Sequence, residues 1–282
     1  MTHTVPIPQP AAEAGMTRLV LCDDFESVET IDVSGEGKAG YTWYTDRPYN
    51  MAALTQEDFY VKNSVLYLKP RVCPAAIGLP TYSCKGETGF KYRFGYAEAR
   101  IRVDKPTGKY NGVPAFWGIC YEDFVSHEWV HAGELDILEV NELDNDGTMS
   151  YTGTIHDHFR PGNGEKQRAC TNLVNALGYR NKRDYIDDNW HTYAALWDEG
   201  YVAWYMDGKL MHAARYAEGE LPQYFYRDDP APLPRIEATQ PALQNRTWKG
   251  GHTILNTDEM VLFLGCNYEW PMEVDWVRVW QR

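Results

Sequence analysis

The stretch that decides both the fold and the site reads GELDILEV, residues 133–140. Its three carboxylates are interleaved with Leu, Ile and Val side chains, which favour the buried face of a β-strand. In a regular strand successive side chains point to opposite faces, so Glu134 and Asp136 share one face. Glu139 stands an odd number of steps from Glu134 and would point to the other face. The apolar pair Ile137-Leu138 breaks the alternation, and a one-residue bulge there would return Glu139 to the face of the other acids.

Three acids on one face of a strand suit the cleavage of a glycosidic bond. That reaction uses one carboxylate as nucleophile and another as acid and base, about 5 to 5.5 Å apart when the anomeric configuration is retained. A third carboxylate helps the other two hold different protonation states. Glu134 and Glu139 are separated along the strand by roughly 13 Å, so the pattern also predicts a curved sheet that lines a cleft. The simpler alternative is a strand with a solvated acidic face.

The composition of the chain limits its class and its partners. Its 282 residues, 44% of them hydrophobic, suffice for one large all-β domain. Aromatic residues make up 14% of the chain, and flat rings with polar edges suit sugar faces. The net charge of −13 argues against nucleic acid as a partner. The chain contains no run of 18 apolar residues, so we expect no membrane span. The first residues do not have the pattern of a signal peptide.

Short strands and turns follow one another from Leu19 onward, without a repeat or a linker. Residues 97–103 alternate apolar and polar side chains, and residues 191–212 read as a meander with a hairpin at Asp207-Gly208. Residues 261–264 and 272–279 predict two closing strands. We therefore predict an all-β fold, a β-sandwich jelly roll with a concave substrate cleft. Residues 1–17 are expected to form a disordered or loosely packed tail, and residues 18–282 a single catalytic domain.

Six cysteines are present without a C-x-x-C pair, which argues against a zinc ribbon or a thioredoxin-like site. Cys73 and Cys84 flank a loop that contains Pro and Gly, and they are either a disulfide or buried free thiols.

Several ordered motifs make the chain resemble glycoside hydrolase family 16 over most of residues 19–282. The acids match the bulged form of the family pattern, E-x-D-x-x-E, which is usual in its laminarinase and algal-galactanase branches. Four further stretches resemble family strands: FGYAEAR at 94–100, PAFW at 114–117, HTY at 191–193 followed by WYMDG at 204–208, and VDWVRVW at 274–280.

The resemblance implies catalytic roles for the three acids. Glu134 would be the nucleophile, Glu139 the acid and base, and Asp136 the residue that positions and tunes Glu134. Trp117 and Trp129 would be platforms for sugar rings on either side of the cleaved bond; an isolated Trp in a strand is otherwise more often a core residue.

The resemblance also implies lesser roles elsewhere. His156 would contact the sugar near Glu139, and Asn50 would bind a hydroxyl group of the glycone. The reaction would need no cofactor, but the family often holds a structural Ca²⁺, here with Asp275 as a ligand; oxygen ligands suit calcium. Asp275 as a plain surface acid is the alternative. His156 and His158, two residues apart on one strand face, also raise the alternative of a metal site.

The expected function is that of an endo-acting retaining glycosidase on a β-linked polysaccharide, with β-1,3-glucan or β-1,3(4)-glucan favoured. Two alternatives stay open, a hydrolase of an algal galactan (agarose, porphyran or carrageenan) and a non-catalytic carbohydrate-binding protein on the same fold. A metal-dependent hydrolase that uses His156 and His158 is a third. By family resemblance we expect a secreted or periplasmic protein, with a polysaccharide as its partner and a monomer as its state.

Overall fold

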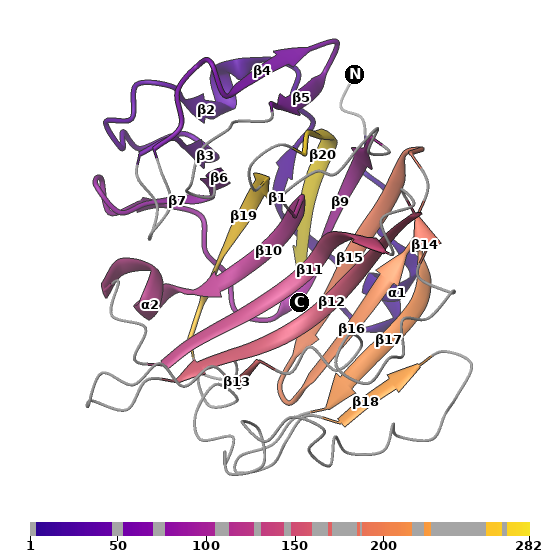
Figure 1. Cartoon of the computed structure of the whole chain (residues 1–282). Helices are drawn as coiled ribbons and strands as arrows, with labels where there is room; N and C mark the ends of the chain where they lie inside the picture. Colours follow the sequence, from indigo (N-terminus) through magenta and orange to yellow (C-terminus); the bar gives the residue numbers. More distant parts are fainter. Residues whose placement is uncertain are drawn as a thin grey trace.

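Two antiparallel sheets stacked face to face form the body of the protein in a computed structural model (Figure 1). The structure describes residues 4–46, 53–69, 77–104, 113–126, 131–143, 148–159, 169–170, 185–186, 188–215, 223–226, 258–266 and 270–282. Within these ranges, none of the helices is long and apolar enough to span a membrane.

The nine-stranded sheet has the order β18-β17-β16-β15-β9-β20-β5-β4, and β1 also pairs with β20. Its strands are β1 (Arg18–Asp23), β4 (Phe59–Lys62), β5 (Val65–Leu68), β9 (Gly95–Val103), β15 (His191–Asp198), β16 (Tyr201–Met206), β17 (Lys209–Arg215), β18 (Gln223–Tyr226) and β20 (Met272–Gln281). The predicted meander is present, with Asp207 and Gly208 both at positive φ in its turn, as a tight hairpin requires.

The seven-stranded sheet has the order β13-β12-β11-β10-β19-β6, and β14 also pairs with β12. Its strands are β6 (Ile77–Pro80), β10 (Ala115–Cys120), β11 (His131–Leu143), β12 (Thr148–Phe159), β13 (Ala169–Cys170), β14 (Tyr185–Ile186) and β19 (Met260–Cys266). In Figure 1, β10, β11 and β12 cross in front of the nine-stranded sheet. Smaller pieces complete the fold: β2 (Ile31–Asp32) with β3 (Trp43–Tyr44), β7 (Tyr82–Ser83) with β8 (Thr88–Gly89), a 3-10 turn at Val28–Thr30, α1 (Gln9–Glu13) and α2 (Tyr121–Ser126).

The main core lies between the two sheets. It takes every second side chain of the strands that face it, such as Ala97 and Ala99 from β9, and Leu262 and Leu264 from β19. The alternating side chains of these strands point to the other face of their own sheet. This pattern is the β-sandwich jelly roll that the sequence predicts.

The N-terminal residues differ from the disordered or loosely packed tail expected at 1–17. Residues 4–17 cross the far side of the nine-stranded sheet, where Ala11 of α1 and Met16 are buried against Tyr96 and Trp280. Because this segment covers the far side, residues 95–99 of β9 are buried on both faces, whereas Arg100 and Arg102 are partly exposed. The physical reason is that, without this segment, the large apolar side chains of Tyr96 and Trp280 would be exposed to water.

Of the two cysteines that flank the Pro- and Gly-containing loop, Cys84 is a free thiol with its Sγ 3.4 Å from the carbonyl oxygen of Phe124. Cys73 lies outside the described residues, so the choice between a disulfide and free thiols stays open for it.

Candidate active site

The register of β11 against its neighbours contains the predicted bulge. Asp136 lies opposite Thr154 of β12, but Glu139 lies opposite Thr152, so the two residues between them face a single residue of β12. The same irregularity separates the pairs that β11 makes with β10, where Trp117 lies opposite Asp136.

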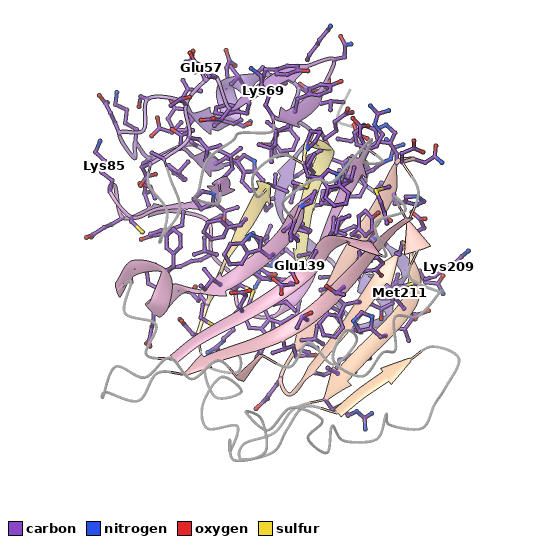
Figure 2. The ribbon with its side chains drawn as sticks, viewed as in Figure 1. Glu57, Lys69, Lys85, Glu139, Lys209 and Met211 are labelled. Atoms are coloured by element: carbon purple, nitrogen blue, oxygen red, sulfur yellow. The ribbon has the colours of Figure 1, made fainter. Side chains whose placement is uncertain are left out.

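The bulge brings the three acids to one face of the seven-stranded sheet. Glu134, Asp136 and Glu139 pair in turn with His156, Thr154 and Thr152, which are two residues apart along β12 and therefore share a face. Their partners on β10 are Ile119, Trp117 and Ala115, which share a face for the same reason. Figure 2 shows Glu139 on the face of this sheet that is turned away from the core. The apolar residues of the stretch, Leu135, Ile137, Leu138 and Val140, all lie in the core between the sheets.

The three acids differ in their exposure. Asp136 is only 2% exposed, whereas Glu134 and Glu139 are half-buried. Thr152 Oγ1 donates a long hydrogen bond of 3.5 Å to Glu139 Oε2. Glu134 and Glu139 are therefore the more accessible members of the trio, and Asp136 lies between them as a buried neighbour.

Aromatic side chains border the acids on the side of β10 and β19. Trp117 is half-buried and stacks on Phe263, with ring centroids 4.5 Å apart and planes 20° apart. Phe124 of α2 meets Phe263 edge to face, and Tyr82 of β7 meets Phe124 in the same way. Phe263 thus covers one face of the Trp117 ring, so a sugar could stack only on the other.

The sequence analysis did not predict this group of aromatic side chains. Phe263, Phe124 and Tyr82 come from three distant parts of the chain, and α2, with six residues, is too short for a helical period to be visible. The one usable signal was that Val261 and Phe263 alternate with Leu262 and Leu264, so β19 has apolar side chains on both faces.

The remaining predicted site residues are placed as follows. Trp129 and Asn50 lie outside the described residues. His156 lies in β12 directly opposite Glu134, and His158 lies two residues further on; their side chains are not described. The concavity of the sheet at the acids stays a prediction, because segments such as 127–130 and 251–257 lie outside the described part of the chain.

Asp275 lies in β20 of the other sheet and forms an ion pair with Arg100. The ion pair occupies one oxygen of the carboxylate, and calcium ligation by Asp275 stays a prediction. Across the residues that the structure describes, no three His, Cys, Asp or Glu side chains form a group that could hold a metal ion.

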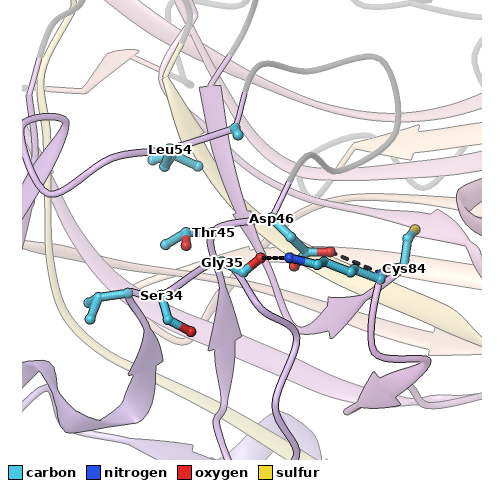
Figure 3. A pocket seen from close by; sticks show the side chains of 9 residues that line it. Ser34, Gly35, Thr45, Asp46, Leu54 and Cys84 are labelled. Carbon is cyan, nitrogen blue, oxygen red and sulfur yellow. Dashed lines mark hydrogen bonds between the residues drawn. The ribbon is translucent and has the colours of Figure 1, made fainter.

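A separate cavity of about 570 Å³ lies beside β3 and β7 (Figure 3). Asp46 lines it and accepts hydrogen bonds from Ser83 Oγ at 3.0 Å and from the Lys85 backbone N–H at 3.2 Å. Lys85 Nζ donates to the Gly35 carbonyl oxygen at 2.9 Å, across the cavity wall. Asp46 and Ala53 both line the cavity, and they flank the segment that contains Asn50.

A jelly-roll sandwich that presents three carboxylates beside aromatic rings on one sheet face is the construction of a glycosidase. The comparison with known families agrees. Residues 48–258 match the profile of Glycosyl hydrolases family 16, and the chain belongs to this family.

One relative and two solved structures illustrate the likeness. Glucan endo-1,3-beta-glucosidase A1 of Niallia circulans is 28% identical over 133 residues, which are 46% of this chain and 17% of the relative. The chain thus covers less than a fifth of that protein. The laminarinase from Flavobacterium sp. UMI-01 aligns with a TM-score of 0.53 and 14% identity, over 94% of this chain and 100% of that one. The kappa-carrageenase from Pseudoalteromonas carrageenovora aligns with a TM-score of 0.51 and 16% identity, over 99% of both chains. At such identities the structures show a shared fold, and both the predicted family and the predicted jelly roll are confirmed.

Proposed function

We propose that the protein is an endo-acting, retaining hydrolase of a β-linked polysaccharide. The observation that carries this proposal is the bulge in β11, which puts Glu139 on the same face as Glu134 and Asp136. A strand without the bulge would bury Glu139 in the core and leave no pair of accessible glutamates.

In the proposed reaction Glu134 attacks the anomeric carbon while Glu139 donates a proton to the leaving oxygen. The glycosidic bond breaks, and a covalent glycosyl-enzyme forms on Glu134. Glu139, now a carboxylate, then takes a proton from water, which displaces Glu134 and restores both groups. An ionised Asp136 beside both glutamates would favour the protonated form of the acid that must donate.

The mechanism is tested with Glu134→Gln and Glu139→Gln. Each change keeps the shape of the side chain but removes its ability to attack or to donate a proton, so each should lower kcat at least about 10³-fold. The first-formed anomer, followed by proton NMR during early hydrolysis, should have the configuration of the cleaved bond. Full activity in either variant, or an inverted first product, would contradict the proposal.

We propose β-1,3-glucan or β-1,3(4)-glucan as the substrate. Support comes from the family match together with the relative named as a glucan endo-1,3-beta-glucosidase. Laminarin, lichenan, agarose, porphyran and kappa-carrageenan are incubated with the enzyme, and the products are sized. A ladder of oligosaccharides from laminarin or lichenan is expected. Oligosaccharides released only from agarose, porphyran or kappa-carrageenan would mean that the substrate is a galactan. Retention on a glucan gel, with no reducing ends released from any of these polysaccharides, would identify a binding protein.

A further inference from the structure

The bulge in β11 is supported from the core by a side chain of the facing sheet. Trp204 of β16 is fully buried and donates its Nε1–H to the backbone carbonyl oxygen of Asp136 at 2.7 Å. This carbonyl belongs to the last residue before the bulge. In a regular ladder a strand carbonyl points along the sheet toward a neighbouring strand, and a bulge disrupts that ladder locally. The bulge therefore makes this oxygen accessible to an indole that approaches from the other sheet.

His212 of β17 holds the indole in place. The two rings stack with centroids 4.4 Å apart and planes 15° apart, and His212 is 1% exposed. Its Nε2 lies 3.0 Å from the carbonyl oxygen of Gly153. Because a carbonyl oxygen only accepts, Nε2 carries the proton in this hydrogen bond. Burial lowers the pKa of His212 to about 4, so the ring is neutral near pH 7.

Gly153 is the residue of β12 that faces the bulge, between Thr152 and Thr154. A Cβ atom at this position would lie 2.2 Å from Cδ1 and 2.4 Å from Nε1 of Trp204. The indole thus lies against the backbone of β12 while it bonds to β11. Trp204 and His212 together bind both strands at the point where the register between them shifts.

We propose that Trp204 is a positioning residue for the reaction, held by His212, and that its hydrogen bond to Asp136 keeps β11 in the bulged register. This inference rests on the proposed function. A regular register would turn Glu139 by one step to the core face, away from Glu134. The indole N–H has its partner in the bulged register, so it favours the form in which both glutamates face the substrate.

The kinetic test compares Trp204→Phe with Trp280→Phe. Phenylalanine keeps a buried ring at position 204 but removes the donor. Trp280 is a matched control, since it is also buried, lies on the far side of the nine-stranded sheet, and its Nε1 has no hydrogen-bond partner among the described residues. We expect kcat of Trp204→Phe to fall about tenfold or more, because displacements of about 1 Å can cost 10²-fold. KM should stay within about twofold, because the groups that hold the sugar remain. The pH–rate profile should also shift, since the separation of the acids sets their pKa values. A kcat no lower than that of Trp280→Phe would overturn the proposal.

A second measurement works without turnover. Hydrogen exchange followed by mass spectrometry reports on the backbone of residues 131–143, which should exchange faster in Trp204→Phe than in the wild type or in Trp280→Phe. If Trp204→Phe does not fold, His212→Gln is used instead, which keeps a donor for Gly153 but loses the stacking; its exchange should change in the same direction. The proposed function itself would be contradicted by an inactive wild type or by active Glu134→Gln and Glu139→Gln variants. Failure of the positioning role would show as unchanged exchange in residues 131–143.

Discussion

Replacement of Gly153 by Ala should destabilise the protein because the new methyl group has no space. Its Cβ would lie 2.2 Å from Cδ1 of Trp204, and that ring is fixed by its stack on His212 and its hydrogen bond to Asp136. Overpacking of this kind costs about 1 to 3 kcal/mol. If the indole moves away, the buried carbonyl of Asp136 loses a donor, at about 1 to 3 kcal/mol more. Alanine recovers about 0.5 to 1 kcal/mol of backbone entropy in a strand. The net loss should be about 1 to 5 kcal/mol.

Urea denaturation, followed by tryptophan fluorescence, measures this loss. Gly118→Ala in β10 is the matched control, because its Cβ would lie 2.4 Å from Sδ and 2.6 Å from Cγ of Met260, an unbranched side chain that adapts more easily than an indole. We expect this control to cost less than Gly153→Ala, at about 1 kcal/mol. The cost of Gly153→Ala should also shrink in a Trp204→Leu background, as coupled neighbours require. Equal costs for the two Ala variants, or equal costs of Gly153→Ala in both backgrounds, would refute the reasoning.

Three further predictions concern the nine-stranded sheet. Burial raises the pKa of Glu98 from its ordinary value of 4.5 to about 7, so its protonated form stabilises the fold at low pH, and this contribution is lost as the pH rises through 7. Glu98→Gln should therefore be more stable than wild type at pH 8, by up to about 3 kcal/mol, and equal to it near pH 4; a difference independent of pH would contradict this. Met16→Ala should cost about 2 to 4 kcal/mol in urea, because Met16 is buried under Trp280 and its neighbours; a cost below about 0.5 kcal/mol would mean that the N-terminal segment is not docked in solution. Asp275→Asn should cost less than about 1 kcal/mol, since its ion pair with Arg100 is partly exposed, and calcium should shift the melting temperature of this variant and of the wild type equally; a calcium shift lost only in the variant would identify Asp275 as a ligand.

The bulge could be predicted from the sequence because the side chains of a strand point to alternate faces in the order of the residues. Glu134 and Glu139 can share a face only if one residue between them is extra, and Ile137-Leu138 marks the place. The strands of the meander were predictable for a similar reason, since the Asp207-Gly208 turn fixes where one strand ends and the next begins.

The contacts between distant segments could not be predicted in this way. Trp204 and Asp136 are 68 residues apart, and no local pattern shows that an indole of one sheet reaches a carbonyl of the other. The helices α1 and α2 have five and six residues, too few for an apolar period of 3.6 to be visible. Both helices form because they cover apolar surface on the sheets, which exists only after the sandwich has assembled.

The place of β20 within its sheet bears on how the protein is made. This strand, near the end of the chain, pairs with β9 along one edge and with β5 and β1 along the other. A nascent chain that has not yet released residues 272–281 from the ribosome leaves three earlier strands without their partner, and their backbone groups can pair with another chain. These edges stay open until residues 272–281 have been synthesised, so the yield of soluble protein should depend on chaperones that shield them.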